Sequence, residues 1–421
     1  MMSKNYLPRI ADKLLDFALE ASGAVLIEGP KWCGKTRTAN EKAASTLYMQ
    51  DPDQATAYQK AADTKPSLLL RGATPRLIDE WQTAPVLWDA VRFAVDQRGE
   101  PGQFILTGSA VPTDNATQHT GTGRISRLLM RPMTLLESGE SSGEISLAAL
   151  FDGTAEPDGF SSLSIEKLAF ALARGGWPAA IGVAERAALR QVYDYVEAVI
   201  NTDISRVDGV EKSPARVRSL LRSLARNVAT LASLGTIQSD MGAEETISEK
   251  TISSYLGALR RIFVVEDLPA WNPALRSKTT LRTRPKRHFI DPSIAAAVLR
   301  ARPERLLNDF NTFGFLFESL CIRDLRVYAQ AVDGEVFYYQ DRSGLEADAI
   351  IYLKDGHWGA IEIKMGANEI DMAAKNLLAL QNKVNLDKMP PPSFLMVLTG
   401  TELAYRRKDG VMVVPIGCLG D

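Results

Sequence analysis

Apolar positions follow two different periods in the first third of the chain. Between residues 7 and 21, and again between 85 and 97, they recur every three or four residues, which is the spacing of an amphipathic helix. Other apolar positions form short continuous runs with the length of buried strands, at 25–27, 46–49, 77–78 and 103–106. Short strands that alternate with helices predict an α/β fold with a parallel sheet.

The first of these runs leads directly into a phosphate-binding loop. Gly29, Gly34, Lys35 and Thr36 fill the pattern Gly-x-x-x-x-Gly-Lys-[Ser/Thr]. Glycines let backbone N–H groups turn toward an anion, and the helix that begins at Gly34 adds its own unpaired N–H groups. Lys35 then reaches the β- and γ-phosphates, while the Thr36 hydroxyl binds the magnesium that bridges them. We therefore expect ATP and Mg²⁺ to be bound by Gly29, Pro30, Lys31, Trp32, Cys33, Gly34, Lys35 and Thr36.

Two acids and two hydroxyls follow later strands of the same predicted sheet. Asp79 and Glu80 end an apolar run, and a sheet brings such an end to the edge where the phosphates lie. After a phosphate loop, this pair predicts a Walker B site in which Asp79 holds magnesium and Glu80 polarises the attacking water. Thr107 and Ser109 follow the next strand, where a polar side chain suits a sensor that orients water against the γ-phosphate. A turn that simply uses Gly and Ser explains these two residues equally well.

Several arginines lie near the predicted nucleotide site in the sequence. A polar loop at 112–124 is followed by Arg127 and Arg131, and with Arg124 these are candidates for an arginine finger. Ordinary surface arginines are the alternative for each. Arg9 lies in the helix before the first strand, where it either contacts a nucleotide base or is a solvated charge.

In the middle of the chain the spacing of apolar residues is mainly helical. Helices are predicted at 165–174 and 185–200, then from Pro214, which Ser213 caps. A second helix from residue 248 and the strand-like segment after Phe263 complete a winged helix-turn-helix. On this interpretation the residues that face a DNA major groove are Lys250, Thr251, Ser254 and Tyr255. The alternative is that this domain contacts only protein, as many winged-helix domains do.

A basic run follows the predicted wing. Residues 276–288 contain six Lys or Arg in thirteen positions, which makes this segment the best local candidate for phosphate contacts. The alternative for such a run is a solvated charged face.

The last part of the chain carries a second group of acids. Glu318 lies in a helical pattern, Asp348 in a predicted strand, and Glu362 and Lys364 in the strand after it. Alternate residues of one strand point the same way, so Glu362 lies beside Lys364, and Asp348 and Glu362 can share a magnesium ion. Lys364 would then orient water or stabilise charge on a phosphodiester. Because Glu-x-Lys is common on exposed strands, spacing alone favours an ordinary surface strand.

Bulk composition narrows the class of protein. A chain of 421 residues suits two or three domains, and a formal net charge of −2 excludes coating of nucleic acid by bulk charge. Its three cysteines and three histidines are far apart, so neither a disulfide framework nor a zinc-ligand spacing is indicated. No apolar run has the length of a signal core or a membrane span. We expect a cytoplasmic protein without a membrane partner.

The ordered set of motifs resembles a prokaryotic family, the AAA-type ATPases joined to the C-terminal domain of unknown function 4143. The motifs that carry the resemblance are the phosphate loop, Ile78-Asp79-Glu80-Trp81-Gln82, Leu106-Thr107-Gly108-Ser109-Ala110, Gly176-Trp177-Pro178, Phe317-Glu318-Ser319, and Glu346-Ala-Asp348 through Glu362-Ile-Lys364. Lys31-Trp32 stands where that family often has Arg-Gln.

This resemblance covers nearly the whole chain and implies an architecture. It implies a P-loop NTPase parallel sheet core over 1–160, a helical lid over 161–210, a winged helix-turn-helix over 211–275, and an α/β restriction-endonuclease-like domain over 276–421. It strengthens Lys35, Asp79, Glu80, Thr107 and Ser109 as ATPase residues. It also implies that Glu318, Asp348, Glu362 and Lys364 occupy the positions of a PD-(D/E)xK nuclease site.

Two functions remain open at this point. One is an ATP-hydrolysing enzyme that couples nucleotide state to a DNA-associated winged-helix and nuclease-like module, with DNA contacted through 248–288. The other is a nucleotide-gated switch that binds DNA or a protein partner, with the nuclease-like domain catalytically inactive. The oligomeric state and the source of any arginine finger are open in both.

Overall fold

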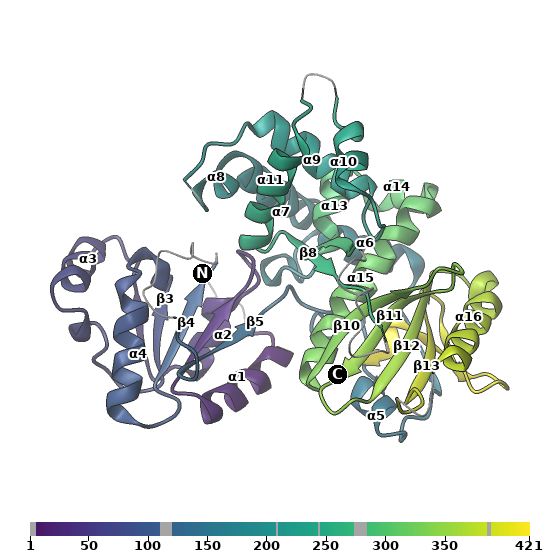
Figure 1. Cartoon of the computed structure of the whole chain (residues 1–421), viewed down its shortest axis with the longest axis horizontal. Helices are drawn as coiled ribbons and strands as arrows, with labels where there is room; N and C mark the ends of the chain where they lie inside the picture. The colour runs from purple at the N-terminus through teal and green to yellow at the C-terminus, as the bar shows by residue number, and fades with distance from the viewer. Residues whose placement is uncertain (1–5, 110–119, 208, 243–244, 273–283, 385–388) are drawn as a thin grey trace. The chain divides into compact units, whose positions relative to one another are not determined.

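The computed structural model describes residues 6–109, 120–207, 209–242, 245–272, 284–384 and 389–421. The chain forms two compact units (Figure 1). The first comprises Met1–Pro132, Thr202–Glu211 and Gly257–Val264, and the second comprises Met133–Asn201, Lys212–Leu256 and Val265–Asp421. Within the described ranges, no helix is both long and apolar enough to cross a membrane.

A parallel five-stranded sheet forms the core of the first unit, which confirms the α/β prediction. Its strands pair in the order β2-β3-β4-β1-β5. The strands are β1 (Ala24–Glu28), β2 (Ser45–Tyr48), β3 (Arg76–Asp79), β4 (Phe104–Gly108) and β5 (Ile125–Leu129). All four pairings are parallel, so the carboxyl ends of β1, β3 and β4 meet at one edge.

Helices cover both faces of this sheet because successive strand residues point to opposite sides. They are α1 (Ile10–Ala21), α2 (Lys35–Lys42), α3 (Ala55–Thr64) and α4 (Val86–Arg98). On one face Val25 and Ile27 pack with Leu15 of α1. On the other, Leu26 belongs to a cluster with Trp88 and Val91 of α4. The two helices expected from apolar spacing are therefore α1 and α4.

One part of the second unit is a helical region. Its helices are α6 (Ile165–Arg174), α7 (Glu185–Ala198), α9 (Pro214–Arg226), α10 (Leu234–Asp240), α13 (Pro292–Leu299) and α14 (Pro303–Asn308). Ser213 caps α9, since its side chain accepts a hydrogen bond from the Arg216 backbone N–H. α13 packs against α6, α7 and α9, so segments far apart in sequence form this region. The helix α11 (Glu249–Arg261) has residues in both units.

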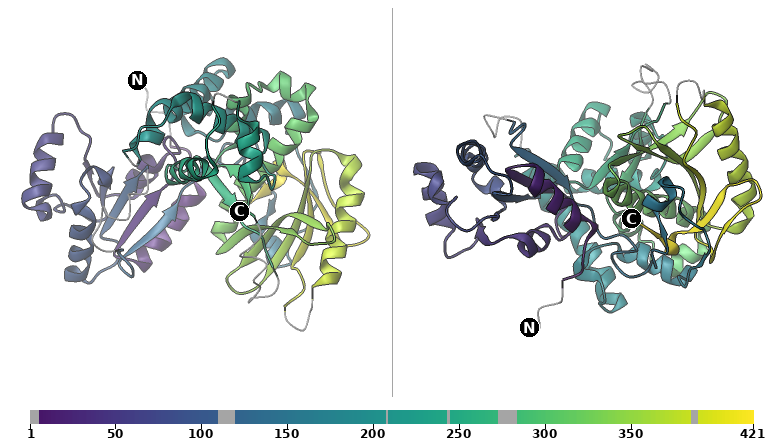
Figure 2. Two further views of the ribbon diagram at one scale, coloured as in Figure 1. Left: turned by 45° about the horizontal axis from the view of Figure 1, so that its top comes forward. Right: turned by 90° about the horizontal axis from the view of Figure 1, so that it is seen from below.

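A mixed seven-stranded sheet closes the second unit, in the order β10-β11-β12-β13-β15-β14-β7. The strands are β7 (Gly159–Phe160), β10 (Gly334–Gln340), β11 (Glu346–Leu353), β12 (Trp358–Lys364), β13 (Phe394–Thr399), β14 (Leu403–Arg406) and β15 (Met412–Pro415). The helix α15 (Phe310–Ala331) packs against β10, β11 and β12. The helix α16 (Ile370–Lys383) joins β12 to the parallel strand β13 and covers one face (Figure 1, Figure 2).

Gly175 and Gly176 allow their segment to pack closely against Met133 and Ser293 in the second unit. Gly175 has φ +73°, and a Cβ there would lie 2.3 Å from Ser293 Oγ. A Cβ at Gly176 would lie 2.0 Å from the Met133 carbonyl oxygen. Trp177 Nε1 then donates a hydrogen bond of 3.0 Å to Ser293 Oγ. The Gly-Trp-Pro motif is therefore explained by packing.

A network of buried charged side chains stabilises the segment around Gly176. Asp291 accepts hydrogen bonds from the Gly176 backbone N–H and from Arg323, at 3.0 and 2.8 Å. Arg323 also pairs with Asp324 at 2.7 Å, and Asp324 accepts from the Leu135 backbone N–H at 2.9 Å. All three charged side chains are buried, so each charge is compensated within the network.

Candidate functional site

The phosphate loop has the backbone conformation that its glycines predict. Gly29 has φ +151°, and a Cβ there would lie 2.1 Å from the Met130 carbonyl oxygen. Gly34 has φ +104° and is the N-cap residue of α2, so the helix begins with its N–H groups at the loop. Trp32, a non-glycine residue, also has positive φ, and its side chain is exposed.

Lys35, the first residue of α2, turns its side chain back toward this loop. Its side chain is 6% exposed, and Nζ donates hydrogen bonds to the carbonyl oxygens of Gly29 and Pro30 at 2.9 and 2.7 Å. The ammonium is thus placed among the backbone groups that would surround a phosphate.

Asp79 joins the loop to the neighbouring strands. Its Oδ1 accepts a hydrogen bond of 2.6 Å from the Thr36 hydroxyl and another of 2.6 Å from the Thr107 hydroxyl. The parallel pairing of β3 with β4 sets Asp79 opposite Thr107 in register. The structure therefore brings together the loop threonine, the Walker B aspartate and the candidate sensor threonine. Oxygen ligands of this kind suit magnesium.

Glu80 lies beside this group in a strained backbone conformation. It has φ +55°, and its carboxylate accepts hydrogen bonds from the Gln82 amide and, at 3.4 Å, from the Ser109 hydroxyl. Burial raises the pKa of Glu80, with Lys35 opposing and Asp79 reinforcing the shift. Sequence reasoning missed Gln82 as a site residue. Its position two residues after the predicted catalytic acid was the available signal.

The arginines near the site have structural partners. Arg9 is buried and donates hydrogen bonds of 2.8 Å to the Cys33 and Arg131 carbonyl oxygens, so the expectation of a solvated charge is wrong, while contact with a nucleotide base stays a prediction. Arg127 pairs with Glu28 at 3.0 Å, and Arg124 pairs with Asp96 at 2.8 Å. Residues 112–119 of the polar loop lie outside the described residues.

A second site lies in the second unit, where four predicted residues come together. Lys364 Nζ lies 3.1 Å from Asp348 Oδ2 and 2.7 Å from Glu362 Oε2. A fifth residue, Lys286 of β9 (Lys286–Phe289), joins them, with Nζ 3.0 Å from Glu318 Oε1 and 3.7 Å from Asp348 Oδ1. Glu318, Asp348, Glu362 and the two lysines therefore form one cluster, which we call the lysine–carboxylate cluster.

Burial and mutual repulsion perturb the acids of this cluster. Burial, reinforced by Asp348, raises the pKa of Glu318 to about 7. The same two causes raise the pKa of Glu362 to about 7. Burial also opposes ionisation of Asp348, but Lys364 and Lys286 outweigh it and hold the pKa of Asp348 below its usual range. One carboxylate is thus kept charged while two neighbours are held close to neutral.

Lys286 shows that the basic run is not a uniform charged face. Its side chain is 8% exposed and lies in the cluster, and Arg287 donates a hydrogen bond of 2.6 Å to the Ala232 carbonyl oxygen. For these residues the alternative of a solvated face is wrong. Residues 276–283 of the run lie outside the described residues. Sequence reasoning missed Lys286 because its charge was attributed to the run.

The predicted metal ligands of the cluster are tied to ammonium groups. In the part of the chain that the structure describes, no three His, Cys, Asp or Glu residues are arranged to hold a metal ion. A metal bound by Glu318, Asp348 and Glu362 therefore stays a prediction, as does magnesium bound by Thr36 and Asp79.

The proposed groove-facing residues of α11 differ in exposure. Lys250 and Ser254 are exposed, and Thr251 shares a hydrogen bond of 2.9 Å with Ser248. Tyr255 is only 8% exposed. Tyr255 belongs to the core rather than to an outer face.

Comparison with known families gives three matched domains. Residues 21–138 match an AAA domain, 165–305 match a domain of unknown function, DUF8612, and 313–419 match another, DUF4143. The chain thus combines an AAA-type ATPase domain with a C-terminal DUF4143 domain. This combination confirms the family resemblance that the ordered motifs indicate.

Similar proteins add little about activity. Uncharacterized proteins of Mycobacterium bovis and Mycobacterium tuberculosis are each 24% identical over 353 residues, which is 82% of this chain and 71% of the relative. A Walker-type ATPase of Pyrococcus abyssi has a TM-score of 0.41 and 15% identity, over 70% of this chain and 96% of that one.

Proposed function

We propose that this protein binds ATP with Mg²⁺ and hydrolyses it at the carboxyl edge of the first sheet. The observation that carries the proposal is the pair of 2.6 Å hydrogen bonds by which Thr36 and Thr107 meet on one oxygen of Asp79. Together with the AAA domain match, it supports a Walker-type site with a sensor.

Each side chain then has a defined task. Lys35 and the N–H groups at the start of α2 bind the phosphates, and Thr36 with Asp79 holds Mg²⁺, which neutralises charge on the β- and γ-phosphates. Glu80 accepts hydrogen bonds from Gln82 and Ser109, which orient its carboxylate toward an attacking water. The raised pKa of Glu80 makes it a stronger base than an exposed glutamate.

Steady-state ATP turnover tests this proposal. Lys35→Ala or Glu80→Gln should each lower Mg²⁺-dependent turnover by roughly 10²–10⁴-fold, because each removes a group that acts on the reacting phosphate or water. Lys42→Ala, a lysine of α2 whose partner is the exposed Asp16, is the matched control. Undiminished turnover in both site variants would remove the assignment.

The output of the ATPase is proposed to be a DNA-associated module. Three helices, α9, α10 and α11, precede β8 (Val265–Leu268) and its antiparallel partner β9, which is the element order of a winged helix. Exposed Lys250 and Ser254 on α11 are suited to contact duplex DNA. Lys250→Glu should weaken duplex binding, whereas unchanged affinity would favour the protein-contact alternative.

A nuclease is a second candidate function, supported by the lysine–carboxylate cluster. The Lys364 ammonium lies 3.1 Å from the Asp348 carboxylate and 2.7 Å from the Glu362 carboxylate. Cleavage of DNA with Mg²⁺ or Mn²⁺ that disappears in both Asp348→Ala and Lys364→Ala would support it. Cleavage that survives in both variants would point to a contaminant. Absence of cleavage, with DNA or protein binding that changes between ATP and ADP, would support the inactive switch.

A further inference from the structure

A cleft in the helical region of the second unit has no role in the sites above. Its volume is about 880 Å³, and it is lined by α7, α9, α13, α14 and the start of α15. All of its lining residues belong to the second unit. Its lining includes five arginines: Arg218, Arg222, Arg226, Arg300 and Arg305.

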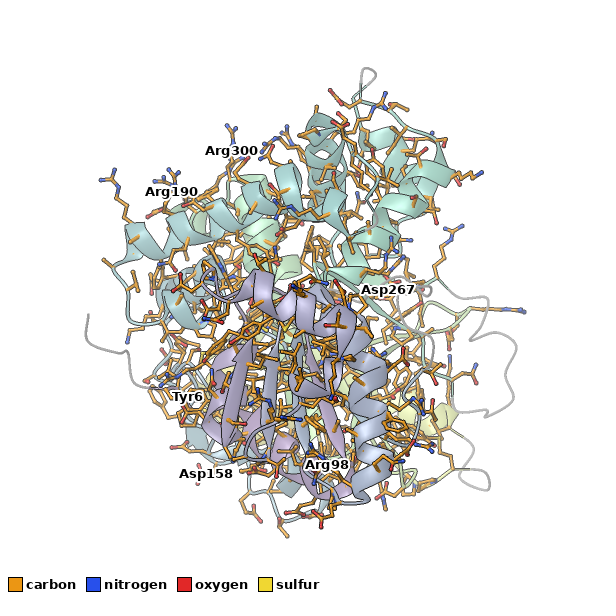
Figure 3. The ribbon with its side chains drawn as sticks, turned by 90° about the vertical axis from the view of Figure 1, so that its left-hand side faces the viewer. Tyr6, Arg98, Asp158, Arg190, Asp267 and Arg300 are labelled. Atoms are coloured by element: carbon orange, nitrogen blue, oxygen red, sulfur yellow. The ribbon has the colours of Figure 1, made fainter. Side chains whose placement is uncertain are left out.

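Three of these arginines form a regular row. Arg218, Arg222 and Arg226 are spaced by four residues along α9, which places them on one helix face about 6 Å apart. Arg300 ends α13 and projects at the surface of the helical region (Figure 3), and Arg305 lies on α14. Arg218 and Arg226 are paired with Glu197 and Asp240, so the positive charge of the cleft comes mainly from Arg222, Arg300 and Arg305.

Three acids also line the cleft, Glu197, Glu245 and Asp309, and the charge of Arg305 acts on Asp309. Glu197 pairs with Arg218 at 2.6 Å and accepts from Asn201, and Asp309 accepts hydrogen bonds from the Thr312 backbone and hydroxyl. Among the described residues, no carboxylate lies within ion-pair distance of Arg222, Arg300 or Arg305. Three guanidinium groups are thus available to an anionic ligand.

The remaining lining mixes polar residues with aliphatic ones and one aromatic side chain, Tyr193. Tyr193, Val196 and Ile200 of the α7 segment line the same cleft, and Phe310, 61% exposed, directly follows the lining residue Asp309. Arginines that track a backbone beside aromatic and aliphatic surface are typical of single-strand recognition, because unpaired bases offer faces for stacking. A duplex keeps its bases stacked inside and is usually read by an element that enters a groove.

We propose that this cleft binds single-stranded nucleic acid. Arg222, Arg300 and Arg305 contact successive phosphates, while bases lie on the Tyr193 side. This inference rests on the nucleic-acid association proposed above, but it assigns a different surface and a different form of nucleic acid from α11 and its duplex.

The test measures anisotropy of a fluorescein-labelled oligothymidine single strand with the full chain over a range of salt concentrations. Arg222→Glu combined with Arg305→Glu should weaken binding by at least ~10-fold and make the log–log salt slope shallower by about two. The control is Arg342→Glu combined with Lys408→Glu, two exposed residues of the same unit with the same change in net charge. It should bind within about twofold of the unaltered chain, since bulk charge is not the cause.

Several outcomes would overturn the proposal. They are equal affinity in the two double variants, no binding of the single strand at low salt, and an arginine effect confined to duplex probes. ATP turnover and the melting temperature of the cleft variant should match those of the control, so that misfolding is recognised. If Lys250→Glu weakens duplex binding while the cleft variant binds the single strand normally, the cleft proposal fails and the proposed function stands.

Discussion

The ATP site and the lysine–carboxylate cluster arrange acids and lysines in opposite ways. In the first, Asp79 is held by two neutral hydroxyls, and Lys35 is held by backbone carbonyl oxygens. In the second, Lys364 and Lys286 lie directly against Asp348, Glu362 and Glu318. Hydroxyls orient a carboxylate while leaving its charge for a metal, whereas ammonium groups neutralise it. The first arrangement suits a metal-nucleotide site, and the second is already compensated internally.

Removal of one lysine should therefore affect stability most at the cluster. Lys286→Met leaves Glu318 and Asp348 buried without this partner, which should lower the free energy of unfolding by about 3–5 kcal/mol. Urea denaturation of the full chain, followed through the unfolding of the second unit, measures this loss. Lys42→Ala, which removes an exposed pair with Asp16, should cost less than about 1 kcal/mol. Equal losses in the two variants would contradict the distinction.

The lysine–carboxylate cluster should also make the stability of the fold depend on pH. The pKa of Glu318 is raised to about 7, so the folded state retains a proton that the unfolded chain releases near its ordinary value of about 4.3. More protons bound in the folded state mean that this group's contribution decreases as pH rises through this window. Across these limits the contribution of Glu318 should decrease by roughly 3–4 kcal/mol, and Glu318→Gln should remove this decrease. A slope unchanged by Glu318→Gln, in urea titrations at several pH values, would refute this contribution.

At the ATP site the expected effect is on rate. Thr107→Val removes one of the two hydroxyls on Asp79, and a hydrogen bond to a charged group contributes about 1.5–3 kcal/mol. Turnover should therefore fall by roughly 10–100-fold. The matched control is Thr46→Val, because Thr46 lies on the edge strand β2 and its hydroxyl donates to Asn40 of α2. Parallel losses in both variants would show that the sensor role of Thr107 is wrong.

The smallest effect is expected at the arginines beside the ATP site. Arg124→Ala and Arg127→Ala each remove a partner of Asp96 or Glu28, and both arginines are about half exposed. ATP turnover should change by less than about threefold, as for other exposed pairs. A loss near 10³-fold in either variant would instead identify an arginine finger.

The grouping of the proposed ATP-site residues was predictable because it depends on local sequence. Gly29, Gly34, Lys35 and Thr36 lie within one loop, and the strand before Asp79 is apolar, so the motif and the sheet position are visible together. The roles of Gln82 and Arg9 were not predicted. Gln82 contacts Glu80 two residues before it, a local signal that was overlooked. The partners of Arg9, the Cys33 and Arg131 carbonyl oxygens, are set by the fold.

The lysine–carboxylate cluster was predictable only in part. The spacing of Asp348, Glu362 and Lys364 reflects neighbouring strands, which sequence reasoning recovered together with Glu318. Lys286 comes from a strand far earlier in the chain, so only tertiary packing reveals it. The same is true of the arginine cleft, whose residues come from five separate helices.

The glycine pair before Trp177 has an evolutionary consequence. Any side chain at Gly175 or Gly176 would collide with Ser293 or Met133, whether or not nucleotide is bound. The need for glycine at these two positions therefore comes from packing within the second unit and not from nucleotide binding. In homologues that have replaced Lys35, Gly175 and Gly176 should therefore still be present. An alignment of homologues would check this expectation.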